Sequence, residues 1–181
     1  MNRREDGTMD EFRKKIIKSW MERAEDRYRS PSPGFDIGFL FAENLIFCCI
    51  AYEAYAFGKF QKAQMSENRR ELSQKFHSSF EQFVQNRPPK DFKGALNNLK
   101  MEIDKELLDD MTPSSTRPSL DLPDKADLDR ILEIIYRVRS NLLHGGKEVD
   151  QNMQRNMTLI KSSFILLYHI MNLIMKQEGL K

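Results

Sequence analysis

The residues best suited to chemistry in this chain are Arg139 and His144, which are separated by four residues. Cleavage of RNA without a metal ion needs a group that moves the proton of the 2′-hydroxyl and a cation that stabilises the phosphorane. Histidine titrates near neutrality and suits the first task, whereas arginine stays charged and contacts two phosphate oxygens at once. By spacing alone, such a pair is more often a cap on the carbonyls of a helix end, and a phosphate-handling site is the alternative that the flanking residues below favour.

The spacing of Arg139 and His144 separates them around a helix. Five residues correspond to about 140° on an ideal helix, so the two residues do not share a face. A second copy of the motif, brought by a partner subunit, would bring an arginine and a histidine together. Arg137 lies seven residues before His144 and on nearly the same face, so we expect a second phosphate contact or a replacement for Arg139. Glu53 interrupts an apolar helix, and we expect it either to make a structural hydrogen bond or to orient Arg139 or His144.

The flanking residues add a family resemblance. Residues 136–147 read YRVRSNLLHGGK, which resembles the Arg-x4–6-His motif of the HEPN superfamily of small all-helical domains. Tyr136, Leu142 and Gly145 fit the frame of that motif, and residues 47–55, FCCIAYEAY, resemble the apolar helix near the start of HEPN domains. Ser140 and Glu53 stand where the catalytic families frequently carry other polar residues.

This resemblance implies a metal-independent endoribonuclease that acts as a homodimer with RNA as its substrate. It also implies a toxin or phage-defence effector, with an antitoxin as a possible partner. Arg139 and His144 are then the expected catalytic residues, and the expected substrate-binding or orienting residues are Arg137, Ser140, Asn141, Lys147 and Glu53. Two alternatives stay open: a catalytically silent domain that binds RNA or nucleotide, and a helical interaction module.

The sequence lacks the residue patterns that several other chemistries require. There is no glycine-rich phosphate loop and no Glu-x-x-His pair, and the three histidines, at 77, 144 and 169, lie on different segments. We therefore expect neither a metal nor a cofactor. Cys48 and Cys49 are neighbours in an apolar run, so we expect buried free thiols and a reducing cytoplasm.

The composition is that of one soluble globular domain over residues 1–181. Of its residues 40% are hydrophobic and 31% charged, and the 29 basic and 27 acidic side chains leave a net charge of +2. Binding of nucleic acid through bulk charge alone is therefore not expected, and a local patch would be needed. The longest charge-free part of the most apolar stretch covers residues 44–52, far below the ~20 residues of a spanning helix, so we expect no membrane segment.

The hydrophobic periodicity is helical nearly throughout and predicts an all-α bundle of five or six helices. The first helix starts at a Thr8-x-x-Glu11 capping box, with Phe12, Ile16 and Trp20 recurring every four residues. The following helices are expected over about residues 36–64, 66–86, 91–110, 124–144 and 150–177, with a loop at 111–123. The last of them carries a heptad seam suited to an antiparallel bundle.

Overall fold

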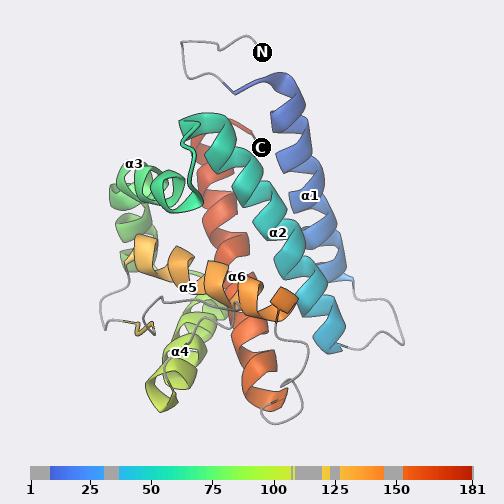
Figure 1. Cartoon of the computed structure of the whole chain (residues 1–181), viewed down its shortest axis with the longest axis vertical. Helices are drawn as coiled ribbons and strands as arrows, with labels where there is room; N and C mark the ends of the chain where they lie inside the picture. The colour runs from blue at the N-terminus through green and yellow to red at the C-terminus, as the bar shows by residue number, and fades with distance from the viewer. Residues whose placement is uncertain are drawn as a thin grey trace.

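The computed structural model describes residues 9–30, 37–106, 108, 120–122, 127–144 and 153–180, and only the backbone of residues 37, 38, 144 and 153. These ranges hold six α-helices: α1 (Glu11–Arg29), α2 (Ile37–Phe60), α3 (Met65–Gln85), α4 (Lys90–Lys105), α5 (Leu128–His144) and α6 (Met153–Gln177). One isolated antiparallel bridge joins Leu108 to Leu120, and the described ranges contain no longer strand. The prediction of an all-α bundle with five or six helices is confirmed (Figure 1).

The start and the buried face of α1 differ from the prediction. The helix begins at Glu11, where the carboxylate of Asp10 accepts a hydrogen bond from the Arg13 amide at 2.8 Å, so the capping box expected at Thr8 is wrong. Thr8 itself lies outside the described residues. The side chains that α1 buries are Ile17, Met21 and Ala24.

The predicted stripe of Phe12, Ile16 and Trp20 is displaced by one residue from the stripe that is buried. One residue corresponds to about 100° around the helix. Phe12 is 72% exposed, while Trp20 is half-buried against the ring of Phe47 on α2, at 5.0 Å between centroids. Both stripes have the helical period, and contact with α2 selects the one that is buried.

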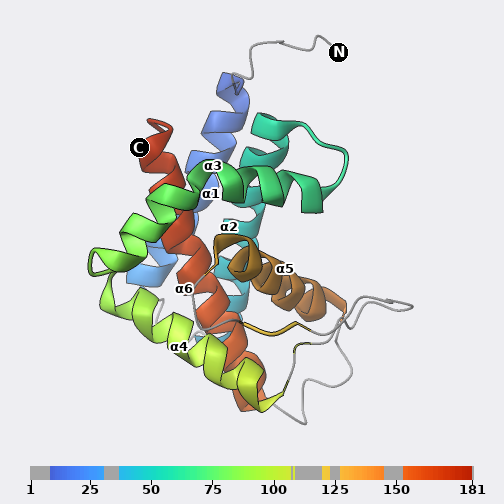
Figure 2. The same cartoon turned by 90° about the vertical axis from the view of Figure 1, so that its left-hand side faces the viewer.

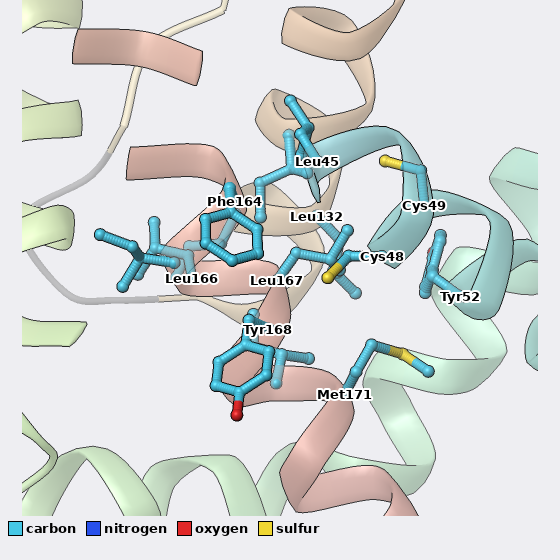
Figure 3. Packing of buried hydrophobic residues seen from close by; sticks show 14 of the residues in the cluster. Leu45, Cys48, Cys49, Tyr52, Leu132, Phe164, Leu166, Leu167, Tyr168 and Met171 are labelled. Carbon is cyan, nitrogen blue, oxygen red and sulfur yellow. The ribbon is translucent and has the colours of Figure 1, made fainter. Parts of the chain in front are cut away.

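The two most apolar helices, α2 and α6, form the centre and run in the same direction. Figure 1 shows both rising through the molecule, with α1 alongside α2. Phe41 near the start of α2 lies 6.0 Å from Phe164 in the middle of α6, and Lys59 near its end lies 3.6 Å from Glu178 just beyond α6. In the close-up of this core, Cys48 of α2 points toward Leu167 of α6 (Figure 3). Both cysteines are free and buried, as predicted.

The antiparallel packing expected for α6 is correct for α4 but wrong for α2. His169 in the second half of α6 contacts Asp91 at the start of α4, at 3.0 Å. Arg155 near the start of α6 donates to the carbonyl of Glu106, at the end of α4, at 2.6 Å. Figure 2 shows α3 and α4 meeting in a V, which brings α4 back along α6.

The ends of α4 and α5 also differ from the prediction. The fourth helix, expected to reach residue 110, ends at Lys105, because the chain then extends and Leu108 exchanges backbone hydrogen bonds with Leu120 at 3.2 and 3.0 Å. Leu120 and Leu122, in the expected loop, are 2% and 4% exposed, and residues 111–119 lie outside the described ranges. Helix α5 begins at Leu128 rather than near residue 124.

By length and composition, two helices would suffice to cross a membrane, over Phe39–Phe60 and Gln154–Gln177. The sequence predicts no segment long and apolar enough to span a membrane, and by length and composition that prediction is wrong. More than half of each segment is buried inside the structure, where α2 and α6 pack on one another. A central helix of a bundle is apolar all round for that reason.

Candidate active site

Helix α5 carries the whole Arg139–His144 segment and is positioned by its apolar face. The side chains on that face are nearly or fully buried: Leu128, Ile131, Leu132, Ile134, Ile135 and Val138. They pack toward α2, α3 and α6, and α5 runs crosswise to α6 in both views (Figures 1 and 2). Because these apolar contacts determine the rotation of α5, they also determine where its polar residues lie.

Arg139 and Glu53 come together from α5 and α2. The Nη2 atom of Arg139 lies 3.6 Å from Oε1 of Glu53, and the side chains are 24% and 27% exposed. The guanidinium carbon of Arg139 also lies over the ring of Tyr136, at 5.8 Å from its centroid. The Nε atom of Arg139 is buried and has no hydrogen-bond partner among the described residues. The guanidinium is thus contacted by Glu53 and Tyr136, and the Arg139 side chain stays partly open to solvent.

The thiol of Cys49 lies close enough to Arg139 and Glu53 to interact electrostatically with both charges. Burial raises the pKa of Cys49 to about 12, the positive charge of Arg139 opposes that rise, and the negative charge of Glu53 adds to it. The thiol is therefore protonated at neutral pH. A protonated thiol is a poor nucleophile, so Cys49 contributes an apolar wall to this region and not a reactive group.

Arg137 occupies a different environment from Arg139. Its side chain is 5% exposed, and its Nη1 atom donates a hydrogen bond to the carbonyl of Leu108 at 3.3 Å. This contact ties α5 to the bridge between Leu108 and Leu120. Arg137 therefore has a structural contact inside the molecule, whereas Arg139 is the arginine of this segment that solvent reaches.

The remaining predicted site residues lie on α5 or outside the described residues. Ser140 and Asn141 are half-buried on α5, and both have interaction partners. His144 is the last residue of α5, so the backbone is helical through the whole Arg139–His144 interval. Lys147 lies outside the described residues. Of the predicted set, the structure brings Glu53 and Arg139 together and adds Tyr136, three residues before Arg139, which sequence reasoning had used only to recognise the motif.

The other histidines lie in separate environments. His77 is exposed on α3 and lies 3.6 Å from Glu81. His169 is mostly buried and shares Asp91 with the hydroxyl of Tyr28. Across the parts of the chain that the structure describes, no group of three or more histidine, cysteine, aspartate or glutamate side chains is arranged to hold a metal ion.

Comparisons with protein-family models, with curated proteins and with solved structures find no match for this chain. The resemblance to HEPN domains thus rests on residues 136–147 and 47–55 of the sequence alone.

Proposed function

We propose that this protein is a metal-independent endoribonuclease of the HEPN type. The observation that supports the proposal most is the contact between Arg139 and Glu53, at 3.6 Å, in a partly exposed position on the helix that carries the motif. A cap on a helix end would instead place the guanidinium on backbone carbonyls of the last turn. An arginine that is oriented by a carboxylate and open to solvent suits a phosphate ligand better.

In this proposal the 2′-oxygen of the RNA attacks the adjacent phosphorus while the bond from phosphorus to the 5′-oxygen breaks. His144 accepts the proton of the 2′-hydroxyl or donates one to the leaving 5′-oxygen, and water accepts or supplies the other proton, so that the 5′-hydroxyl forms. Arg139 stabilises the negative charge that develops on the phosphorane oxygens, and Glu53 orients Arg139. The products are a 2′,3′-cyclic phosphate and a 5′-hydroxyl, and DNA is not cut because it lacks the attacking group.

The proposed active form is a homodimer with a composite site. Positions 139 and 144 are about 140° apart on α5, so one chain does not present both toward the same phosphate. Phe57 lies one turn beyond Glu53 and Leu143 one turn beyond Arg139, and they are 39% and 52% exposed. The Glu53–Arg139 contact is thus bordered by exposed apolar side chains, which a second copy of the chain would cover.

The proposal also includes a toxin or phage-defence role and an antitoxin partner, which rest on the HEPN resemblance. It further includes a cytoplasmic location, which rests on the two free cysteines. The two rival functions are a catalytically silent HEPN domain that binds RNA or nucleotide and a helical interaction module. The silent domain would bind RNA without cutting it. The interaction module would neither bind nor cut RNA.

The decisive experiment is incubation of RNA with the wild-type protein in EDTA, beside the variants His144→Ala and Arg139→Ala. We expect cleavage by the wild type with 2′,3′-cyclic phosphate ends, a rate lower by about 10²- to 10³-fold in Arg139→Ala, no cleavage by His144→Ala, and no cleavage of DNA of the same sequence. Cutting of DNA, or activity that appears only after Mg²⁺ or Mn²⁺ is added, would overturn the mechanism. Binding of RNA by all three proteins without cleavage would favour the silent domain.

A further inference from the structure

We propose that Tyr136 is a positioning residue that holds the guanidinium of Arg139 ready for the substrate phosphate; this inference rests on the proposed endoribonuclease function. Tyr136 precedes Arg139 by three residues on α5, a spacing that places two side chains next to one another on a helix. The guanidinium carbon lies 5.8 Å from the centroid of the tyrosine ring. This is within the range in which the negative face of an aromatic ring attracts a cation.

The ring supports the guanidinium without using its hydrogen-bond donors. A guanidinium carries five N–H groups, and a carboxylate or a carbonyl that held it would occupy some of them. Glu53 approaches at Nη2, and Nε is buried. An aromatic face binds the flat side of the group instead. The N–H groups that are neither buried nor directed at Glu53 therefore stay available for the two-pronged contact that arginine makes with phosphate oxygens.

Two supports on different elements restrict an otherwise mobile side chain. An arginine side chain loses rotamer entropy when it is fixed in one conformation. Glu53 limits Arg139 from α2, and Tyr136 limits it from within α5. Because this entropy is lost before substrate binds, Arg139 does not have to lose it during the reaction. The expected consequence of removing the ring is a lower kcat and little change in KM.

The support depends on the ring of Tyr136 and not on its hydroxyl. Tyr136→Phe should therefore keep kcat within about two-fold of the wild type. Tyr136→Leu should lower kcat by about 3- to 30-fold, which is the range of cation–π interactions from exposed to desolvated sites. Both variants are assayed in EDTA with the RNA that the wild type cleaves, at matched concentrations of folded protein.

A double-mutant cycle separates action through Arg139 from a general loss of structure. In an Arg139→Gln background no cation remains above the ring, so Tyr136→Leu should change kcat by no more than about two-fold. The matched control is Trp20→Leu on α1, where the guanidinium of Arg23 lies 4.8 Å from the Trp20 ring centroid. Helix α1 makes no contact with α5 within the described ranges, so this variant should keep the kcat of the wild type.

Three outcomes would overturn the inference: full kcat in Tyr136→Leu, an equal loss in Tyr136→Phe, or a full additional loss in the Arg139→Gln background. If Tyr136→Leu does not fold, Tyr136→Met is the second variant, since it keeps an unbranched apolar side chain with high helix propensity. A wild-type protein that does not cleave RNA, or an Arg139→Gln variant that cleaves normally, overturns the proposed function together with this inference. Normal cleavage that requires Arg139 but not Tyr136 overturns the inference alone.

Discussion

Arg137 and Arg139 are two residues apart on α5 and lie on opposite sides of that helix. Two residues correspond to about 200° around a helix. Arg137 is buried and donates to the carbonyl of Leu108, whereas Arg139 is partly exposed and lies beside Glu53. The same residue type thus has a structural contact at one position and a solvent-facing one at the other.

This contrast predicts that replacing Arg137 mainly lowers the free energy of unfolding, whereas replacing Arg139 mainly lowers the rate of RNA cleavage. Arg137→Met should lower the free energy of unfolding by about 1–3 kcal/mol, because a charge-assisted hydrogen bond inside the protein is lost. Arg139→Lys should change it by less than ~1 kcal/mol but reduce RNA cleavage by about 10²-fold, because lysine cannot make a two-pronged contact. Urea unfolding and cleavage rates are measured on both variants. A larger loss of cleavage in folded Arg137→Met than in Arg139→Lys would reverse the assignment.

The second prediction concerns Glu53 as the residue that orients Arg139. Glu53→Gln should reduce RNA cleavage by roughly ten-fold, because the guanidinium is less well directed, while the free energy of unfolding changes by less than ~1 kcal/mol. Glu43→Gln is the matched control, since Glu43 is also on α2, is 25% exposed and pairs with Arg27 of α1. It should cleave RNA at the rate of the wild type. Equal rates for both variants would count against the orienting role.

The third prediction concerns the second subunit. Leu143→Glu should shift the protein from dimer to monomer in light scattering and should lower the specific activity, because the charge would be desolvated at the interface. Met101→Glu is the control: Met101 lies on α4 and is 55% exposed, close to the 52% of Leu143. It should leave the dimer intact. A wild type that is monomeric at every concentration would contradict the composite site.

The fourth prediction concerns the stability of the bundle in acid. Burial by itself raises the pKa of Asp91, but the hydrogen bond and charge of His169, the Phe92 amide and the Tyr28 hydroxyl outweigh it, so that the pKa lies below its ordinary value. A carboxylate with a lowered pKa in the folded state adds stability above the unfolded-state value, about 3.9, and loses it as the pH falls through the folded-state value.

Asp91→Asn should therefore lower the free energy of unfolding by about 1–2 kcal/mol near neutral pH, and the difference from the wild type should shrink below about pH 4. Asp104→Asn is the control, because Asp104 is 56% exposed and pairs only with Lys100 of its own helix among the described residues. Its effect should stay within about 0.5 kcal/mol at every pH. A difference for Asp91→Asn that is independent of pH would show that the charge of Asp91 is not involved.

The last prediction tests the helix packing with two glycines. Gly94 lies on the exposed face of α4 with nothing within 4 Å of an added β-carbon, so Gly94→Ala should raise the free energy of unfolding by about 0.5–1 kcal/mol. Gly58 of α2 is buried, and an added β-carbon there would lie 3.0 Å from Cδ of Arg13 on α1. Gly58→Ala should gain less or lose stability in the same thermal unfolding assay. An equal gain at both positions would contradict the close approach of α1 and α2.

Local properties of the sequence determined the helices. The helical periodicity predicted an all-α bundle of five or six helices, and each of the six helices in the structure overlaps one of the predicted ranges. Packing between helices decided which face of a helix is buried when the hydrophobic period allowed more than one. In α1 two stripes with the same period compete, and packing on α2 buries Ile17 and Met21 instead of Phe12 and Ile16.

The candidate site divides in the same way. The residue types and spacing of the motif indicated arginine–histidine chemistry, because charge and titration are properties of single side chains. The roles of Arg137 and Arg139 could not be separated from spacing, since either position could have faced solvent. Only the apolar face of α5 and its contacts with α2, α3 and α6 rotate that helix so that Arg137 meets Leu108 and Arg139 meets Glu53 and Tyr136. Such contacts join residues far apart in the chain, and local periodicity carries no information about them.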